Sequence, residues 1–130
     1  MNILITGASG MIGSALSTRL TQSGHQVFGL SRSDSSAPFH YDPMNDRVQL
    51  STDTNLDVVV NLAGANIADK RWNIQRKEEI LGSRARLTRA LSLALSKSQP
   101  PPHTLLSASA IGFYGNQCLS LIHISEPTRP

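Results

Sequence analysis

The first thirteen residues, MNILITGASGMIG, constrain the fold of this chain more than any other segment. An apolar run over Asn2–Thr6, typical of a strand, leads directly into glycines spaced as GxxGxxG at Gly7, Gly10 and Gly13. In a strand–turn–helix unit of this kind, the first glycine takes backbone angles that residues with a Cβ rarely adopt. The second lets a diphosphate approach the main chain, and the third lets the helix pack against the strand. The segment therefore predicts the phosphate-binding start of a dinucleotide-binding fold.

The residues after the glycines support this interpretation, because a glycine pattern alone is also common in ordinary turns. Apolar residues follow at helical spacing, at Met11, Ile12, Ala15, Leu16 and Leu20. No Gly-Lys-Ser/Thr follows, which excludes a Walker phosphate loop. Free N–H groups and the positive end of the helix dipole would hold the phosphates. We predict cofactor contacts at Gly7, Ser9, Gly10, Met11, Ile12 and Gly13.

The rest of the chain alternates strand and helix signals, which predicts an α/β fold: a Rossmann-like, doubly wound parallel sheet that stops after about the fifth strand. The predicted elements after the first strand are a helix over 11–23 closed by Gly24, strands over 25–30, 57–62 and 104–109, a long helix over 73–97, and a short strand near 39–41 within a loop. Val58, Val59 and Val60 indicate a strand buried on both faces. The long helix should bury a stripe of Ile80, Leu87, Leu91 and Ala94.

The end of the second strand predicts which dinucleotide is bound. An acidic side chain there favours the ribose of NAD, whereas a basic one accommodates the 2′-phosphate of NADP. This chain has Leu30, Ser31 and Arg32, a hydroxyl followed by a permanently charged guanidinium. Asp34 is the rival, two residues farther along. We therefore predict NADP in preference to NAD, with Ser31 and Arg32 at the phosphate.

Composition excludes several other classes of protein. With 130 residues, of which 39% are hydrophobic and 16% charged, the chain makes one domain at most. It shows neither a signal peptide nor an apolar run of membrane-spanning length, so we expect a cytoplasmic protein with no membrane partner. The single cysteine and the scattered histidines predict no metal site.

The chain has a formal net charge of +3, and its positive charge is concentrated in residues 69–89. This segment contains seven lysines and arginines and three acidic residues, so its own net charge is +4. A basic helix could contact nucleic acid, but no recognition motif accompanies it, and a solvated helix face is the simpler interpretation. Arg84 and Thr88 of the same segment could instead face the cofactor cleft.

These motifs resemble the short-chain dehydrogenase/reductase superfamily in its extended form. The resemblance rests on GASGMIG, on NLAG at Asn61–Gly64 and on SASAIGFYG at residues 107–115. NLAGANIADKRW followed by RKEEILGSRARLTRAL is similar to the NADP-binding "epimerase family", a group of atypical members often labelled nucleoside-diphosphate-sugar epimerases. The resemblance implies that Leu62, Ala63 and Gly64 contact the cofactor.

Catalysis in ordinary members of the superfamily uses a tyrosine, a lysine four residues later and a nearby serine or threonine. This chain has no YxxxK, since Asn45 follows Tyr41 and Cys118 follows Tyr114 at that spacing. Ser107 and Ser109 are the candidates for the serine; we also place Ser107 at the cofactor and keep Ser109 as the single catalytic candidate.

The family resemblance stops near residue 117. Residues 119–129, LSLIHISEPTR, match the translation of a transposase adapter used in preparing sequencing libraries. We therefore expect residues 1–117 to be part of an NAD(P)-binding Rossmann domain and residues 118–130 to be a non-native tail, with Cys118 on either side of the junction. A genuine divergent C-terminus is the alternative.

Together these observations predict an NADP-binding fragment of an epimerase- or oxidoreductase-like protein, inactive as given. The longer parent would act as an oxidoreductase or isomerase on a sugar nucleotide or another small molecule. A cofactor-binding sensor or scaffold without turnover is the alternative, and nucleic-acid binding through residues 69–89 is the third candidate.

Overall fold

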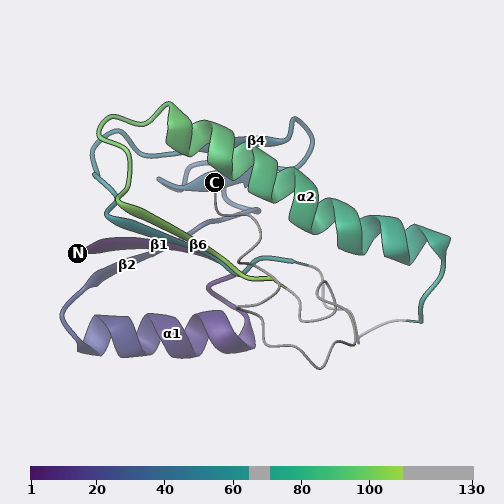
Figure 1. Ribbon diagram of the computed structural model, residues 1–130, viewed down its shortest axis with the longest axis horizontal. Helices are drawn as coiled ribbons and strands as arrows, with labels where there is room; N and C mark the ends of the chain where they lie inside the picture. Colours follow the sequence, from purple (N-terminus) through teal and green to yellow (C-terminus); the bar gives the residue numbers. More distant parts are fainter. Residues whose placement is uncertain (65–70, 110–130) are drawn as a thin grey trace, which may run out of the picture.

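The computed structural model describes residues 1–64 and 71–109 of the chain (Figure 1). The elements are, in order, β1 (Asn2–Thr6), α1 (Met11–Gln22), β2 (Gln26–Gly29), β3 (His40–Asp42), β4 (Arg47–Gln49), β5 (Val58–Asn61), α2 (Ile74–Ser96) and β6 (Thr104–Ser107). Within these described ranges, no helix is both long and apolar enough to cross a lipid bilayer.

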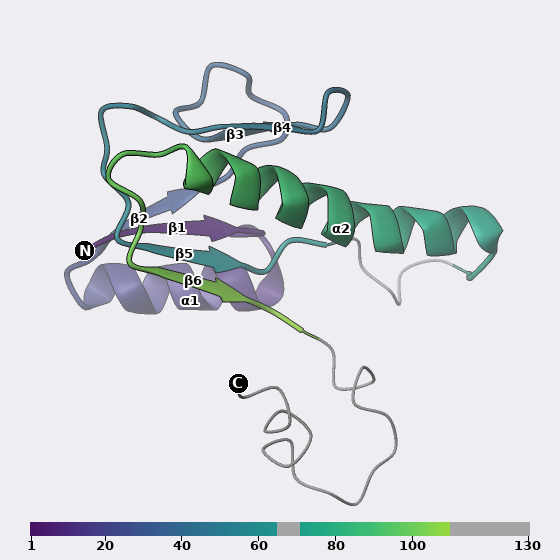
Figure 2. The same cartoon turned by 45° about the horizontal axis from the view of Figure 1, so that its top comes forward.

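Four strands form one parallel sheet in the order β2-β1-β5-β6. The chain adds β2 on one side of β1 and later β5 on the other side, so the winding reverses between β1 and β5. Helix α1 lies on one face of the sheet, while α2 and the β3–β4 hairpin lie on the other (Figures 1 and 2). The predicted fold class, a Rossmann-like α/β sheet, is confirmed. In such sheets ligands bind at the carboxyl ends of the strands where the winding reverses.

The main core lies between the sheet and α2. Leu4 and Val59 from the sheet pack with Leu87 and Leu91 of α2, and Phe39 closes the side next to the hairpin. The predicted helix stripe is therefore correct at its centre. Ile80 is only half-buried, because the first turns of α2 extend past the carboxyl ends of the strands (Figure 2).

The opposite face of the sheet is less completely covered. Ile3 and Ile5 are buried there, but Gly13 is the only buried residue of α1, and Met11 and Ile12 are 86% and 65% exposed. The prediction that both side chains belong to an apolar packing face is wrong, because they stand at the start of the helix, beyond the strand ends. Because this face of the sheet is only partly covered, Val58 and Val60 of β5 are half-buried, whereas Val59 on the other face is fully buried. The prediction of a strand buried on both faces is therefore correct for one face only.

The connection between β2 and β5 holds more regular structure than the sequence predicted. The expected short strand is present as β3, but β4 was missed, and the two pair as an antiparallel hairpin with Tyr41 opposite Val48. Asp46 closes the turn at a φ of 48° and accepts a hydrogen bond from the Tyr41 hydroxyl at 3.1 Å. The helix boundaries are as expected: Gly24 has a φ of 88° after α1, and Asn73 caps α2 by accepting a hydrogen bond from Arg76 N at 2.7 Å.

Candidate functional site

The glycine turn after β1 is built so that a side chain at two of its three glycines would strain the backbone or clash with it. Gly7 has a φ of 73°, and a Cβ there would come within 3.1 Å of Ala63 Cα. A Cβ on Gly13 would overlap the Gly7 carbonyl oxygen and lie 2.8 Å from its carbon. The turn itself is closed by a hydrogen bond from Gly10 N to Gly7 O at 3.0 Å. The conformational argument for Gly7 and Gly13 is thus confirmed.

Gly10 differs from the other two glycines. It has the extended conformation of an N-cap residue, and a Cβ there would meet only Gly7 O, at 3.3 Å. No side chain caps the start of α1, and its first turn contains no acidic residue. By contrast, Asn73 caps the start of α2 with its own side chain. The exposed start of α1, next to Ser9 and Gly10, thus leaves its first donors without a side-chain acceptor, which suits an anionic ligand.

The loop after β5 lies against this turn. Thr6, fully buried at the end of β1, accepts hydrogen bonds through its hydroxyl from the backbone N–H groups of Leu62 and Ala63, both at 3.1 Å. The same hydroxyl donates to Asn61 Oδ1 at 2.6 Å. These bonds fix the Leu62–Gly64 segment beside the glycine turn, at the point where the sheet winding reverses.

Asn61 extends this network to α2 and β6. Its Nδ2 donates to the Thr88 hydroxyl at 3.0 Å and to the Ser107 hydroxyl at 3.2 Å. Polar side chains from β1, β5, α2 and β6 therefore meet at one edge of the sheet. Sequence reasoning missed Thr6 and Asn61 as parts of the site, although each is a polar residue at the end of an otherwise apolar strand, a signal that could have identified both.

The two candidate serines lie at different places. Ser107 is the last residue of β6 and is joined to Asn61, so it belongs to the assembled edge. Ser109 lies two residues beyond the strand and is exposed; the predicted strand over 104–109 is therefore too long. The catalytic role of Ser109 stays a prediction, and Tyr114 and Cys118 lie outside the described residues.

The end of β2 is placed next to the glycine turn, because a Cβ on Gly29 would lie 3.3 Å from Ala8 Cβ. Ser31 is held by the hairpin connection: its N–H donates to Phe39 O at 2.9 Å, and its carbonyl accepts from Tyr41 N at 2.8 Å. Arg32 follows and is exposed. Ser31 and Arg32 thus stand at the same edge of the sheet as the glycine turn.

Asp34, the rival to Arg32, is engaged within its own loop. Its carboxylate accepts hydrogen bonds from the hydroxyl and the backbone N–H of Ser36, at 2.6 and 2.9 Å. These bonds hold the pKa of the Asp34 carboxyl below its ordinary value. The carboxylate is therefore charged at neutral pH and already has donors.

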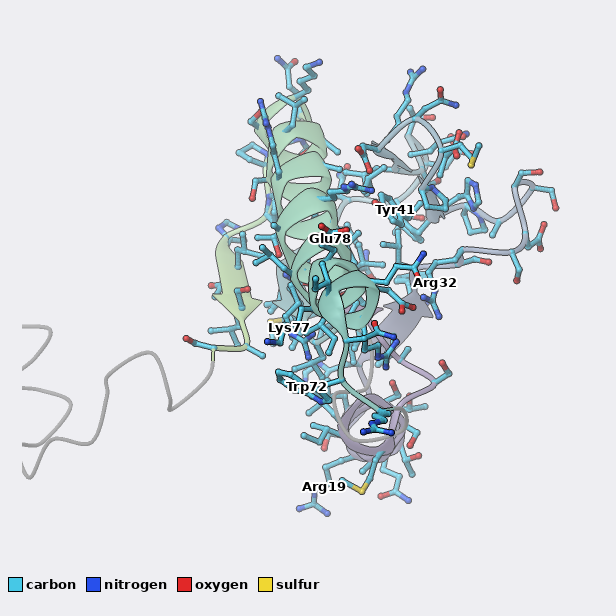
Figure 3. All side chains as sticks on the ribbon, turned by 90° about the vertical axis from the view of Figure 1, so that its right-hand side faces the viewer. Arg19, Arg32, Tyr41, Trp72, Lys77 and Glu78 are labelled. Atoms are coloured by element: carbon cyan, nitrogen blue, oxygen red, sulfur yellow. The ribbon has the colours of Figure 1, made fainter. Side chains whose placement is uncertain are left out.

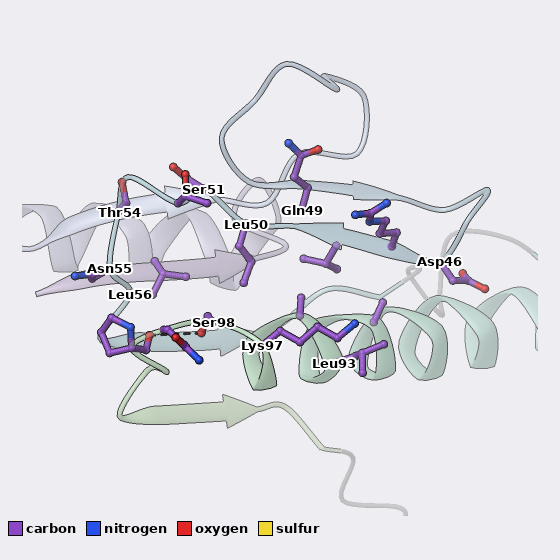
Figure 4. A pocket seen from close by; sticks show the side chains of 17 residues that line it. Asp46, Gln49, Leu50, Ser51, Thr54, Asn55, Leu56, Leu93, Lys97 and Ser98 are labelled. Atoms are coloured by element: carbon purple, nitrogen blue, oxygen red, sulfur yellow. Dashed lines mark hydrogen bonds between the residues drawn. The ribbon is translucent and has the colours of Figure 1, made fainter.

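A cavity of about 540 Å³ lies elsewhere, between the hairpin and the last turns of α2 (Figure 4). Leu50, Leu56 and Leu93 contribute to its apolar lining, and Lys97 and Ser98 stand at its border. Leu56 comes just before β5 and Ser98 before β6, so this cavity is at the amino-terminal edge of the sheet, opposite the glycine turn. None of the predicted cofactor contacts lines it. Among the described residues no group of histidine, cysteine and carboxylate side chains could hold a metal ion.

Comparison with known proteins shows which family this chain belongs to. A model of the NAD dependent epimerase/dehydratase family matches residues 3–129. An epimerase family protein of Mycobacterium bovis is 38% identical over 116 residues, which cover 88% of this chain and 38% of that protein. The chain thus spans well under half the length of this relative.

Two solved structures are similar to most of this chain. The human epimerase family protein SDR39U1, crystallised with NADPH, superposes with a TM-score of 0.71 at 31% identity, covering 88% of this chain and 38% of the human one. A nucleoside-diphosphate sugar epimerase of Corynebacterium glutamicum gives a TM-score of 0.64 at 34% identity, covering 88% of this chain and 24% of its own.

Proposed function

The chain belongs to the NAD dependent epimerase/dehydratase family, and on that premise we propose that it is the NADP-binding part of a longer epimerase- or oxidoreductase-like enzyme. The observation that carries the proposal is the meeting of the glycine turn, the uncapped start of α1 and the Leu62–Gly64 segment where the sheet winding reverses. This edge fits a dinucleotide, because Gly10 leaves room beside exposed backbone donors.

We assign a part of the cofactor to each group of residues. The diphosphate is held at Gly7, Ser9, Gly10, Met11, Ile12 and Gly13, and the adenosine side lies along Leu62, Ala63 and Gly64. The 2′-phosphate lies at Ser31 and Arg32. Such a cofactor supplies hydride transfer at its nicotinamide ring when bound.

The preference for NADP over NAD rests on Arg32 and Asp34. Arg32 is exposed at the end of β2 and carries a permanent charge that suits a phosphate. The carboxylate of Asp34, which could otherwise accept from a ribose, is occupied by Ser36. The related human protein was crystallised with NADPH, which supports the same choice.

We propose that the substrate of the longer protein is a small molecule, and a sugar nucleotide in particular, because the Corynebacterium relative is a nucleoside-diphosphate sugar epimerase. We propose that the chain as given does not turn over substrate, because it has no YxxxK pair for proton transfer. It should therefore bind NADPH without oxidising it in the presence of a carbonyl compound. A parent that binds the cofactor as a sensor, without turnover, is the alternative, and the absence of a Tyr/Lys pair from the parent sequence would favour it.

Calorimetric titration of the 130-residue chain with NADP and with NAD tests the cofactor assignment. The wild-type chain should bind NADP more tightly, and Arg32→Ala should weaken NADP binding by about ten- to a hundredfold, as expected for the loss of a charge-assisted contact, without changing NAD binding. Arg19→Ala is the matched control, since Arg19 lies on the outer side of α1, far from Arg32 (Figure 3). Equal affinity of the wild-type chain for both dinucleotides would refute the NADP assignment.

A further inference from the structure

The cavity between the hairpin and the last turns of α2 has an apolar floor that the main core provides. Val48, Leu56 and Ala90 line it, with only 7%, 8% and 6% of their surfaces exposed. All three belong to the cluster of buried core residues. The position of this floor is therefore fixed by the fold itself and does not depend on a bound molecule.

Leu93 is the apolar residue of this cavity that the fold leaves most exposed. It lies one turn after the buried Ala90 on α2, yet 56% of its surface is exposed. Leu50 stands across the cavity on the hairpin side (Figure 4). A nonpolar ligand between them would remove part of Leu93 from water, which favours binding. The volume of about 540 Å³ is in the range of small-molecule sites.

The charged residues of the lining leave one net positive charge. Among the described residues that line the cavity, only Asp46, Arg47 and Lys97 are charged. Asp46 and Arg47 are neighbours at the hairpin turn, and the Asp46 carboxylate also accepts a hydrogen bond from Tyr41. Lys97 stands apart from them and, within the described part of the chain, makes no ion pair with a carboxylate. The charge that a ligand would neutralise is therefore that of Lys97.

The end of α2 directs the Lys97 side chain along the cavity. The backbone N–H of Lys97 donates to Ala94 O at 3.2 Å, and the Ser98 hydroxyl donates to Leu95 O at 2.9 Å. These bonds fix the last turn of the helix. Figure 4 shows the Lys97 side chain running along the cavity, with its amino group between α2 and the hairpin. A ligand that covers Leu93 can therefore reach this amino group.

We propose that this cavity is a second ligand site, for a monocarboxylate with a hydrocarbon chain of medium length, as in octanoate. The chain lies on the apolar floor and against Leu93, and the carboxylate accepts a charge-assisted hydrogen bond from the Lys97 ammonium. A single negative charge matches the net charge of the lining. The inference goes beyond the proposed function, because none of the predicted dinucleotide contacts lines this cavity.

The first experiment compares head groups and chain lengths in calorimetric titrations of the full 130-residue chain. Octanoate should bind about tenfold more tightly than octylammonium, which has the same chain and the opposite charge. Each buried methylene group should raise the affinity by about three- to fourfold, so hexanoate should bind about tenfold more weakly than octanoate. Failure of octanoate to bind, or equal affinity for octanoate and octylammonium, would overturn the proposal.

The second experiment removes the charge and the apolar wall separately. Lys97→Met keeps the hydrocarbon part of the side chain and should lower octanoate affinity by about tenfold without changing octan-1-ol affinity. Leu93→Gln should weaken binding of both molecules. Lys97 and Leu93 are exposed, so both variants should keep the wild-type urea midpoint. The matched controls Lys77→Met and Leu81→Gln change exposed residues of α2 outside the cavity. Unchanged octanoate binding in Lys97→Met, or an equal loss in the controls, would refute the assignment.

The third experiment locates the bound octanoate on the isotope-labelled chain through its backbone amide NMR signals. The largest shifts should be at Leu50, Leu93 and Lys97, with Gly10 unaffected. Chain saturated with NADP should bind octanoate with unchanged affinity, because the two sites lie at opposite edges of the sheet. Shifts centred on the glycine turn, or competition between octanoate and NADP, would overturn the proposal. Titration of the chain without NADP tests the cavity even if the proposed cofactor does not bind.

Discussion

Replacing Thr6 with valine should destabilise the chain more than its small change of shape suggests. The Thr6 side chain is fully buried, and its hydroxyl takes part in three hydrogen bonds, to Asn61 Oδ1, Leu62 N and Ala63 N. Leu62 N retains a second acceptor, the Thr6 carbonyl at 3.2 Å. Asn61 Oδ1 and Ala63 N would each lose the partner that Thr6 supplies.

An orphaned buried polar group costs about 1–3 kcal/mol, which applies in full to the buried Asn61 Oδ1 and only in part to the half-buried Ala63 N, so together they cost about 2–4 kcal/mol. This is a large share of the roughly 5–15 kcal/mol that stabilises a typical domain. Urea unfolding followed by circular dichroism should show a midpoint lower by about 1 M or more. Thr6→Ser, which keeps the hydroxyl, should retain most of the stability, and the exposed Thr18→Val should change it by less than about 0.5 kcal/mol. A Thr6→Val midpoint equal to that of Thr18→Val would refute the reasoning.

Four further predictions concern the glycine turn, the hairpin and the end of the chain. Gly13→Ala should destabilise the chain by about 1–3 kcal/mol or more, because its methyl meets backbone atoms. Gly10→Val should leave the circular dichroism spectrum native and abolish NADP binding. Normal NADP binding by a natively folded Gly10→Val variant would contradict the cofactor placement. Hydrogen bonds from Asn45 and Met44 lower the pKa of Asp42 below its ordinary 3.8. In acid the unfolded chain therefore binds more protons than the folded chain. The stabilisation from the Asp42 carboxylate is complete above pH 3.8 and is lost as the pH falls through its lower pKa in the folded chain. Asp42→Asn should therefore reduce the dependence of the unfolding free energy on acidic pH, and an unchanged dependence would contradict this prediction. Deleting residues 118–130 should leave NADP affinity unchanged, and a folded deletion variant that no longer binds would show that the tail contributes to the site.

The sequence predicted the sheet and its glycine turn because local signals and tertiary context agree there. The run Asn2–Thr6, the three glycines and the valines of β5 each specify one conformation. The hairpin strand β4 was missed because Arg47, Val48 and Gln49 form a segment too short for a periodic signal. Its pairing with β3 depends on the Asp46 turn and on burial of Tyr41 and Val48 against the core.

The candidate site was predictable in its backbone but not in its side-chain contacts. Gly7 and Gly13 follow from steric rules that hold in any protein. The contacts between Thr6 and Asn61, and between Arg84 and Gly64, join residues 55 and 20 positions apart. No local sequence pattern predicts contacts between residues so far apart in the chain. These contacts follow from the parallel register of β1 with β5 and from the rotation of α2. The exposure of Met11 and Ile12 likewise could not be predicted from the helical spacing of apolar residues, because that spacing does not show where the neighbouring strands end.

The most direct test of the central claim is a titration of the isotope-labelled 130-residue chain with NADP, followed through its backbone amide NMR signals. If NADP binds at the glycine turn, the largest shifts should be at Ser9, Gly10, Met11 and Gly64, at the carboxyl edge of the sheet. Little change should occur around Leu50 and Leu93, which line the cavity at the opposite edge. Shifts concentrated at Leu50 and Leu93, with the glycine turn unaffected, would contradict the claim that the dinucleotide binds where the sheet winding reverses.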